Sequence, residues 1–350
     1  MRSRILIATM AVVMAACPAY AGAAGASDEA EVSKEGKAAI ELGLAYLARI
    51  QNQDGSFRAE LGNLTGGVAS ACMAFMAAGN LPGEGKYGKH VARSIAFLLD
   101  SAQPSGLLMK ERSGQGVMYN HGLATLCLAE AWGHTQDQRI GRVLRRAVQL
   151  QVQAQADNGS WTYVPNGRPG DISITIMQVM ALRAARDAGI AVPPDTIKRA
   201  VGFVESCRSR TIENGLYGYC YNGGGQEPRF SNTAAAVLSL QVCGEYKPAT
   251  VKPGLDFLIH ARKNKADSQW WMYGHYYAAQ AMYQAGLHPQ FKQYWTAWYR
   301  DISAELIKKQ IREGRDSGAF RVDAPGGIIG TAWAIKILAI PYRYLPIYQR

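Results

Sequence analysis

Several features that would narrow the function at once are scarce or missing in this sequence. Only 19% of the 350 residues are charged and no block of Lys and Arg exceeds three residues, so the formal net charge of +11 is a mild bias that does not indicate nucleic-acid binding. No Cys-x-x-Cys pair occurs, which disfavours structural zinc. Beyond the N-terminal region no apolar run reaches eighteen residues, so a membrane-spanning helix is not expected. The 48% of hydrophobic residues exclude a disordered chain.

The N-terminus has the pattern of a secretory signal peptide. Two arginines precede an apolar run over residues 5–16, and an Ala-x-Ala site follows at residues 19–21. We therefore expect residues 1–21 to be removed and the exported chain, periplasmic or secreted, to keep a basic bias of +9. Residues 22–35 are expected to form a flexible segment, and lipidation at Cys17 is an alternative.

Export would permit disulfides, and five cysteines follow residue 21. Cys72, Cys127 and Cys243 lie inside apolar helical runs, where a buried thiol behaves as a small hydrophobe. Cys207 and Cys220 flank a loop, so one disulfide between them is left open.

An internal repeat of about 52 residues occurs six times and replaces the two domains that length alone suggests. Each first half is amphipathic and ends in a turn rich in Gln and Gly, as in AYLARIQNQDGSF and AVQLQVQAQADNGSW. Each second half is rich in small residues and apolar almost all round, as in TGGVASACMAFMAAG. The second halves begin near Gly66, Tyr119, Asp171, Ser231, Gly274 and Gly326.

These two halves predict two layers of helices. An amphipathic half predicts an outer helix with one wet face, and an apolar half predicts a buried inner helix. Thr65, Asn120, Asp171 and Ser231 are expected to cap inner helices. Since uniformly apolar inner helices favour a closed ring over an open solenoid, we expect an all-α (α/α)6 toroid, with one domain over residues 36–350.

The turns carry an aromatic–aliphatic pair, a Gln and a Gly-Ser-Trp/Phe triplet. The motif occurs as Tyr46-Leu47, Gln51 and Gly55-Ser56-Phe57, and again as Gln155 and Gly159-Ser160-Trp161. It resembles the repeat shared by squalene–hopene cyclases and protein prenyltransferase β subunits, and the likeness covers roughly residues 36–340. The resemblance implies membership of the terpenoid cyclase and protein prenyltransferase α/α-toroid superfamily, in which these Gln and aromatic residues are structural.

This sequence contains only parts of the catalytic motifs of that superfamily. Triterpene cyclases protonate their substrate with an Asp-rich motif, whereas Asp171 stands alone here at a position that also suits an N-cap. Prenyltransferases hold zinc with Asp, Cys and His. The nearest counterparts are Cys220 and His275, together with His121, but Gly218 stands where the Asp belongs. We therefore expect no metal or other cofactor.

Exported (α/α)6 barrels also include glycoside hydrolases and polysaccharide lyases. Such hydrolases need two carboxylates about 5–9.5 Å apart in a cleft. The candidate carboxylates in the loops are Asp171, Glu227, Asp316 and Asp323.

The expected binding site is one end of the barrel. Inner helices of a toroid run parallel, so their N-termini converge at one mouth, where their dipoles favour an anionic or electron-rich ligand. Of the 33 aromatic residues, 23 follow residue 200, so an aromatic lining from the last three repeats is expected. Core filling is the alternative for Trp270, Tyr276, Tyr277 and Tyr283. The predicted ligand-binding residues are Tyr119, Asn120, Tyr219, Cys220, Tyr221, Arg229, Asn232, Trp270, Trp271, Tyr273 and Tyr276.

Three functions follow from these observations. The leading hypothesis is an exported toroid that binds a small hydrophobic ligand or an envelope polymer at its mouth, without an evident catalytic centre. The second is an enzyme, terpenoid-cyclase-like or active on polysaccharide, that uses Asp171, His121 or His275 as acid or base. The third is a structural module resting on an anionic polymer. The oligomeric state stays open.

Overall fold

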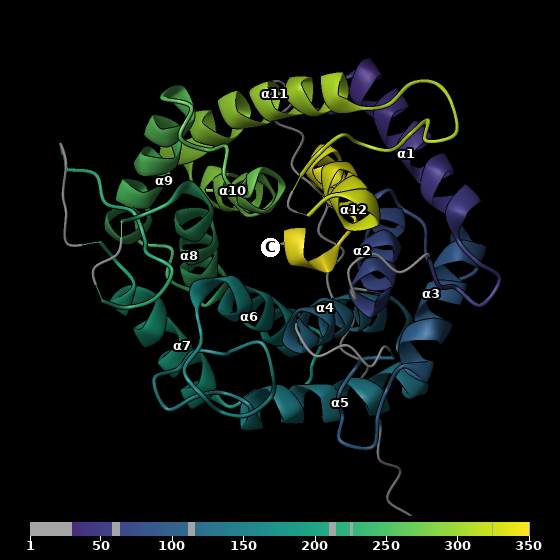
Figure 1. Ribbon diagram of the computed structural model, residues 1–350, viewed down its shortest axis with the longest axis horizontal. Helices are drawn as coiled ribbons and strands as arrows, with labels where there is room; N and C mark the ends of the chain where they lie inside the picture. The colour runs from purple at the N-terminus through teal and green to yellow at the C-terminus, as the bar shows by residue number, and fades with distance from the viewer. Residues whose placement is uncertain are drawn as a thin grey trace, which may run out of the picture.

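The computed structural model describes residues 30–57, 64–110, 116–209, 215–224, 227–323 and 325–349. Within these ranges, twelve α-helices alternate between an outer and an inner layer (Figure 1). The outer helices are α1 (Lys34–Ile50), α3 (Gly88–Asp100), α5 (Gln138–Gln153), α7 (Pro194–Ser206), α9 (Pro248–Lys263) and α11 (Lys292–Lys309). The inner helices are α2 (Leu64–Ala77), α4 (Val117–Thr135), α6 (Ile172–Asp187), α8 (Phe230–Val242), α10 (Trp271–Gly286) and α12 (Gly327–Ala339).

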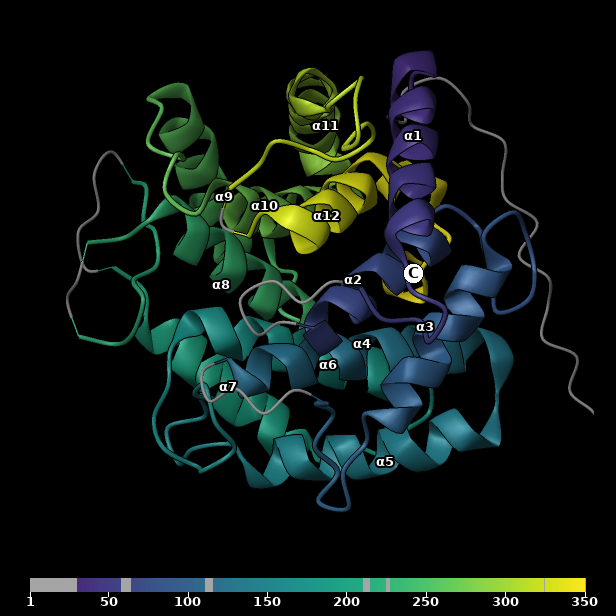
Figure 2. The ribbon, with the colours of Figure 1, turned by 45° about the vertical axis from the view of Figure 1, so that its right-hand side comes forward.

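The inner helices form a closed ring. Each contacts the next along the chain, and α12 contacts α2, so no gap separates the last pair from the first. Outer helices α5 and α7 cover the inner helices α4 and α6 from outside (Figure 2). Within the described ranges the backbone forms isolated β-bridges and no strand. The predicted all-α (α/α)6 toroid is confirmed.

The amphipathic and apolar patterns sort the helices into their layers. All thirteen residues of α8 are buried, as are fifteen of the sixteen in α10. Outer helix α5 instead buries Ile140 and Leu144 and exposes Arg142 and Arg145 to solvent. In the described part of the chain, no helix combines the length and the hydropathy needed to cross a bilayer.

A glutamine clasp recurs at the end of three outer helices. The Nε2 of Gln155 donates to the carbonyl of Gly159 in its own turn, at 3.0 Å, and to that of Thr196 in the next outer helix, at 2.9 Å. Gln51 makes the same pair of bonds toward α3. Gln310 makes them toward α1, so its clasp joins the last outer helix to the first. These glutamines are structural, as the resemblance implies.

Two turn glycines let the clasped segments approach closely. Gly55 and Gly159 have φ angles of 86° and 88°, in the left-handed region that favours glycine. A Cβ at Gly159 would lie 2.0 Å from the carbonyl oxygen of Arg199, and one at Gly55 would lie 2.2 Å from that of Arg93. Each turn therefore packs directly on the backbone of the next outer helix.

The N-caps are only partly as expected. Asp171 caps α6, as predicted. Thr65, Asn120 and Ser231 lie inside the first turns of α2, α4 and α8, so their prediction as caps is wrong. The Asn120 Oδ1 instead accepts from the backbone N of Gly66 at 2.7 Å, which caps a neighbouring helix. The Oγ1 of Thr65 likewise accepts from a backbone N–H outside its own helix, at 3.2 Å.

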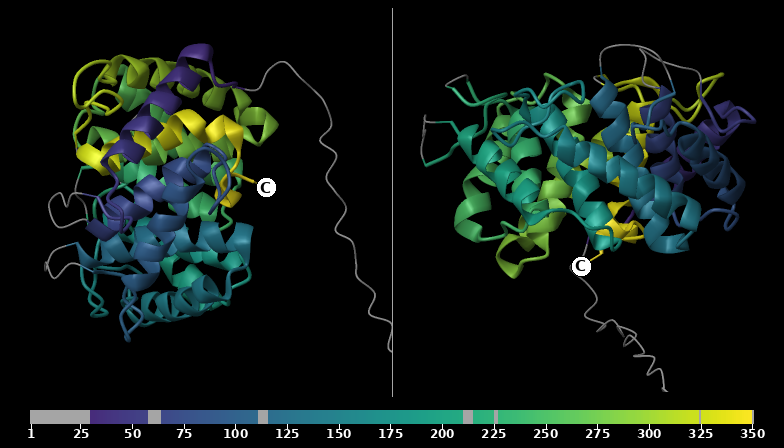
Figure 3. Two further views of the ribbon diagram at one scale, coloured as in Figure 1. Left: turned by 90° about the vertical axis from the view of Figure 1, so that its right-hand side faces the viewer. Right: turned by 90° about the horizontal axis from the view of Figure 1, so that it is seen from below.

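The C-terminal segment closes the end of the barrel opposite the inner-helix N-termini. It contains the 3-10 turns η2 (Ile340–Tyr342) and η3 (Pro346–Tyr348). The hydroxyl of Tyr283 donates to the carbonyl of Tyr348 at 2.8 Å, and the backbone N of Ile347 donates to Glu130. The C-terminus accordingly lies near the ring centre in Figure 1 and at the lower edge in the right panel of Figure 3.

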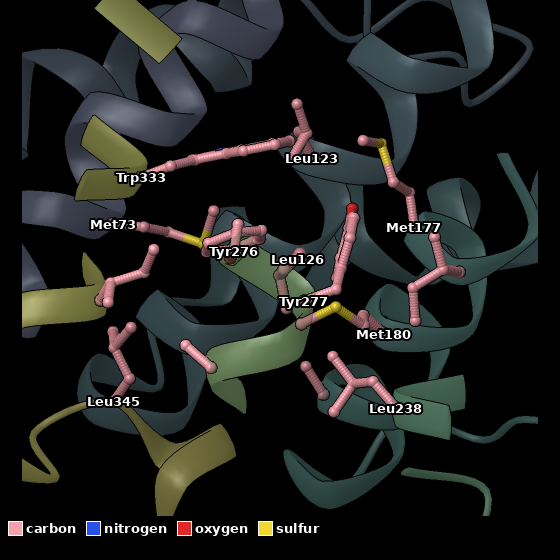
Figure 4. Close-up of a cluster of buried hydrophobic side chains, with 14 of the residues drawn as sticks. Met73, Leu123, Leu126, Met177, Met180, Leu238, Tyr276, Tyr277, Trp333 and Leu345 are labelled. Atoms are coloured by element: carbon pink, nitrogen blue, oxygen red, sulfur yellow. The ribbon is translucent and has the colours of Figure 1, made fainter. Parts of the chain in front are cut away.

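Apolar side chains fill the axis above this segment (Figure 4). Met73, Leu126, Met180, Leu238 and Tyr277 are all buried there. The barrel is therefore filled by side chains at the end that the C-terminal segment closes, and any internal space lies at the opposite end, toward the inner-helix N-termini.

Candidate functional site

A cavity of about 1090 Å³ lies at the N-terminal ends of the inner helices. All six inner helices contribute to its wall from their first turns, with Gly67, Tyr119, Ser173, Ser231, Tyr273 and Ile328. Leu123 and Trp333 bound it below, above Tyr276 and Tyr277 (Figure 4). The structure therefore has a cavity at the mouth where the sequence predicts a binding site.

The wall of this cavity is mainly apolar and aromatic. Arg229 is the one charged residue among the described lining residues, and none of these is a carboxylate. The aromatic side chains in the wall are Phe57, Tyr119, Tyr163, Tyr221, Trp270, Tyr273 and Trp333. Such a surface favours an apolar or ring-bearing ligand.

Asp171 lies directly behind this wall and is 4% exposed. Its Oδ1 accepts from the backbone N of Ser173 at 2.8 Å, from that of Ile174 at 3.3 Å, and from the Ser173 hydroxyl at 2.5 Å. Its Oδ2 accepts from the hydroxyl of Tyr221 at 2.7 Å. Both carboxylate oxygens are thus engaged, and the helix cap accounts for most of these bonds.

Tyrosine hydroxyls connect the carboxylate to the cavity. The hydroxyl of Tyr119 pairs with the Oγ of Ser173 at 2.6 Å, and that of Tyr221 also pairs with Tyr163. Burial raises the pKa of Tyr119 and of Tyr221 well above the usual tyrosine value, so both stay neutral. The result is a polar strip around Asp171 in an otherwise apolar wall.

His121 does not reach the cavity, which corrects its prediction as an acid or base at the mouth. The imidazole is fully buried; its Nδ1 accepts from the backbone N of Leu108 at 3.1 Å and its Nε2 donates to the carbonyl of Ala147 at 3.2 Å. Burial lowers its pKa to about 4, so it stays neutral. These bonds tie α4 to α5 and to the turn after α3.

His275 is also packed away from the cavity, so the same correction applies. Its Nε2 lies 3.0 Å from an oxygen of Asp267, and the guanidinium of Arg262 lies 3.2 Å from the ring. The rings of Trp271 and Phe230 lie 4.5 and 4.8 Å from it, centroid to centroid. Burial lowers the pKa of His275. The cluster joins α8, α9 and α10, and His275 within it is fully buried and is not among the described residues that line the cavity.

Six of the eleven predicted ligand-binding residues line the cavity. They are Tyr119, Tyr221, Arg229, Asn232, Trp270 and Tyr273. Core filling is wrong for Trp270, which is 54% exposed and has a φ of 55°, whereas Tyr276, Tyr277 and Tyr283 are buried in the core.

The other five do not line the cavity, which corrects their prediction. Asn120 and Trp271 each follow a lining residue, but the helical turn of about 100° per residue directs them toward a neighbouring element. Tyr276 lies below the cavity, stacked on Trp333 at 4.3 Å. Tyr219 and Cys220 are buried in the turn before α8, and no disulfide joins Cys207 to Cys220.

The structure does not assemble the alternative catalytic sites. Glu227, Asp316 and Asp323 are exposed and are not among the described lining residues, so Asp171 has no second carboxylate at the described wall. No group of three His, Cys, Asp or Glu side chains within the described ranges is placed to hold a metal ion. Cys220, His121 and His275 are accordingly not brought together.

Sequence reasoning missed three aromatic lining residues, Phe57, Tyr163 and Trp333. Phe57 and Tyr163 reach the cavity from the turns that follow α1 and α5. Phe57 ends one Gly-Ser-Phe/Trp triplet and Tyr163 lies two residues after the other, a signal that could have located both. Because Tyr119 lines the wall too, the aromatic lining is less confined to the last three repeats than the composition suggests.

Comparison with known proteins supports the toroid. The model of the squalene-hopene cyclase C-terminal domain matches residues 119–285. A comparison with curated proteins returns no match.

Solved structures with the same fold span most of the chain. The unsaturated glucuronyl hydrolase from Bacillus sp. GL1 is 15% identical, with a TM-score of 0.59 over 87% of this chain and 96% of that one. The family 76 mannosidase from Bacteroides thetaiotaomicron is 10% identical, with a TM-score of 0.60 over 88% and 97%. A type II terpene cyclase from Scytonema, in complex with geranylgeranyl dihydroxybenzoate, is 12% identical, with a TM-score of 0.55 over 89% and 98%. The chain is therefore similar to the squalene-hopene cyclase C-terminal domain over residues 119–285, and it shares the α/α-toroid fold with these solved structures.

Proposed function

We propose that this protein binds a small apolar ligand in the cavity at the mouth of the toroid. The observation that carries the proposal is the cavity itself. Its volume is about 1090 Å³, and the described residues that line it are predominantly aromatic and aliphatic. Small-molecule sites are concave and mostly apolar, with volumes on the order of 300–1,000 Å³. The small number of polar groups in the wall would orient such a ligand.

The comparisons are consistent with this ligand class. The residues that match the squalene-hopene cyclase model include four of the six inner helices. The Scytonema cyclase of the same fold was solved with geranylgeranyl dihydroxybenzoate, which has a long apolar chain and a ring. The sugar-active neighbours share the fold, but the described wall here lacks the paired carboxylates that glycoside hydrolysis requires.

Gly67 offers a direct test of the cavity. It lies in α2 and lines the cavity, and a Cβ there would meet only Ile328, at 4.0 Å. A Gly67→Phe substitution therefore places a ring in the cavity without a backbone clash. We expect the neutral fluorescent probe N-phenyl-1-naphthylamine to bind the native protein saturably and to bind the variant at least tenfold more weakly.

Gly202 supplies the matched control for that substitution. It lies in outer helix α7, is exposed, and has open space around its Cβ position. A Gly202→Phe variant also adds a phenyl ring to a helical glycine, and should bind the probe like the native protein. Equal probe binding by all three proteins would place the probe outside the cavity and refute the proposal.

A catalytic cavity is the second candidate, and one contact favours it. The hydroxyl of Tyr221 donates to Asp171 and also lines the cavity, so a proton could pass between the carboxylate and a bound molecule. An Asp171→Asn variant keeps an oxygen for the helix cap but cannot supply that proton. Turnover of squalene or of α-1,6-mannotriose that disappears in this variant, with probe binding retained, would establish the enzyme.

We propose export of the protein as well, on the pattern of residues 1–21. That segment and Cys17 lie outside the described residues. Determining the N-terminal residue of the protein recovered from outside the cytoplasm tests this proposal. A mature chain that begins near residue 22 is expected, and a cytoplasmic chain that retains Met1 would contradict it.

A further inference from the structure

The start of α8 lacks a side-chain cap, as does that of the adjacent α10, but in α10 the first-turn N–H of Met272 bonds to the carbonyl of Asp323. Helix α6 is capped by Asp171, and an N–H in the first turn of α2 is bonded by Asn120. Arg229, the residue before α8, makes no side-chain cap. Within the described residues, the first-turn N–H groups of α8 at residues 230–232 have no acceptor. This helix therefore presents free donors and the positive end of its dipole at the cavity mouth.

Two buried polar side chains flank these donors. Ser231 and Asn232 are 4% and 6% exposed, and both line the cavity. In the described part of the chain neither side chain has a hydrogen-bond partner. Because both residues line the cavity, their hydroxyl and amide groups are available to a polar group of a ligand.

Arg229 adds a positive charge at the same place. Its side chain is exposed at the lip, lines the cavity, and forms no ion pair among the described residues. No described lining residue carries a negative charge that would repel an anion. One guanidinium, one hydroxyl, one amide and the free N–H groups match the two oxygens and single charge of a carboxylate.

We propose that the start of α8 binds the carboxylate of an amphiphilic ligand whose apolar body lies in the cavity. This inference rests on the proposed apolar binding and specifies the class of ligand, a long-chain or terpenoid monocarboxylic acid. The carboxylate lies against Arg229, Ser231 and Asn232, and the chain extends toward Leu123, Met177 and Trp333.

The test compares two fluorescent probes that differ only in the head group. cis-Parinaric acid carries a carboxylate, and its methyl ester does not. We expect the native protein to bind the acid about tenfold more tightly than the ester, a ratio typical of one charge-assisted interaction. In Arg229→Gln and in Asn232→Leu the affinity for the acid should fall to that for the ester, while ester binding stays unchanged.

The control is Arg142→Gln, which removes the same charge from outer helix α5, away from the cavity. It should keep the tenfold preference. Equal binding of acid and ester by the native protein would overturn the carboxylate site and leave apolar binding intact, whereas failure of both probes would overturn both proposals. Stronger displacement of the acid probe by dodecyl phosphate than by dodecanoate would contradict the assignment of a carboxylate.

Discussion

At the scale of single residues, the side chains best suited to acid–base chemistry are held by structural hydrogen bonds. Asp171 caps a helix, His121 bonds to α5 and to the turn after α3, and His275 bonds to Asp267 and lies beside Arg262 of α9. The low pKa of His121 follows from burial and leaves it neutral near pH 7. The wall of the cavity instead consists mainly of aromatic and aliphatic side chains, which are poor acids, bases and nucleophiles.

The structural role of Asp171 is open to a stability measurement. Asp171→Ala removes the cap and leaves the hydroxyls of Ser173 and Tyr221 without their acceptor, so we expect unfolding in urea to become easier by about 1–3 kcal/mol. Asp171→Asn keeps one capping oxygen and should lose less than half of that amount. Unchanged stability of the alanine variant would show that the cap contributes nothing.

Two buried ionisable residues, Glu130 and Lys336, predict a distinctive pH dependence of the free energy of unfolding. Burial raises the pKa of Glu130 to about 8 and lowers that of Lys336 to about 7. The stabilising contribution of Glu130 is therefore complete below pH 4.5 and is lost as the pH rises through 8. The contribution of Lys336 is complete above pH 10.5 and is lost as the pH falls through 7.

Substituting each residue separates these two effects. Glu130→Gln should remove the fall in the free energy of unfolding between pH 5 and 8, a change of about a few kcal/mol, and Lys336→Met should remove the rise between pH 7 and 10. Urea titrations across this pH range measure both slopes. The exposed Glu84→Gln is the control and should leave the curve unchanged. A native slope retained in Glu130→Gln would contradict the assignment.

At the scale of helices, the sequence was sufficient to assign each to its layer. Residues 230–242 are apolar or small on every side and form a fully buried helix, whereas residues 138–153 alternate between arginine and aliphatic positions and lie outside. The pattern could not set the rotation of each helix about its axis. In α4, Tyr119 lines the cavity and the adjacent Asn120 does not, because packing against neighbouring helices decides which face turns inward.

Closure of the ring through one glutamine gives a prediction at this scale. Gln310→Ala removes the bond to Ala39 in α1 and the bond to Gly318 in its own turn, and should lower the free energy of unfolding by about 1–3 kcal/mol. Amide hydrogen exchange in α1 should rise with it, because that helix loses one of its bonds to the last repeat.

Gln103 provides the matched control for Gln310. Its Nε2 donates to the carbonyl of Met109 within its own turn and does not join two outer helices. Gln103→Ala should therefore cost less and leave exchange in α1 unchanged. Equal effects of the two substitutions would mean that ring closure does not depend on the clasp.

At the scale of the whole molecule, the toroid is closed at one end and hollow at the other. The C-terminal segment and a layer of apolar side chains fill the lower barrel, while the parallel inner helices open the upper end into a cavity. The sequence predicted the position of that cavity, because the parallel orientation follows from the repeat. It did not predict the contributions of Phe57 and Tyr163, since these depend on how the outer turns fold back over the mouth.

The central claim is that apolar ligands bind inside the ring and not on its outer surface. Grooves on the outside offer the alternative, notably one between α3 and α5 that is lined by Leu99 and Val143. Photo-crosslinking with a long-chain alcohol that carries a diazirine, followed by peptide mass spectrometry, distinguishes the two locations. We predict crosslinks at Leu123, Met177 and neighbouring lining residues, and their loss in Gly67→Phe. Crosslinks confined to α3 and α5, and unchanged in that variant, would contradict the account.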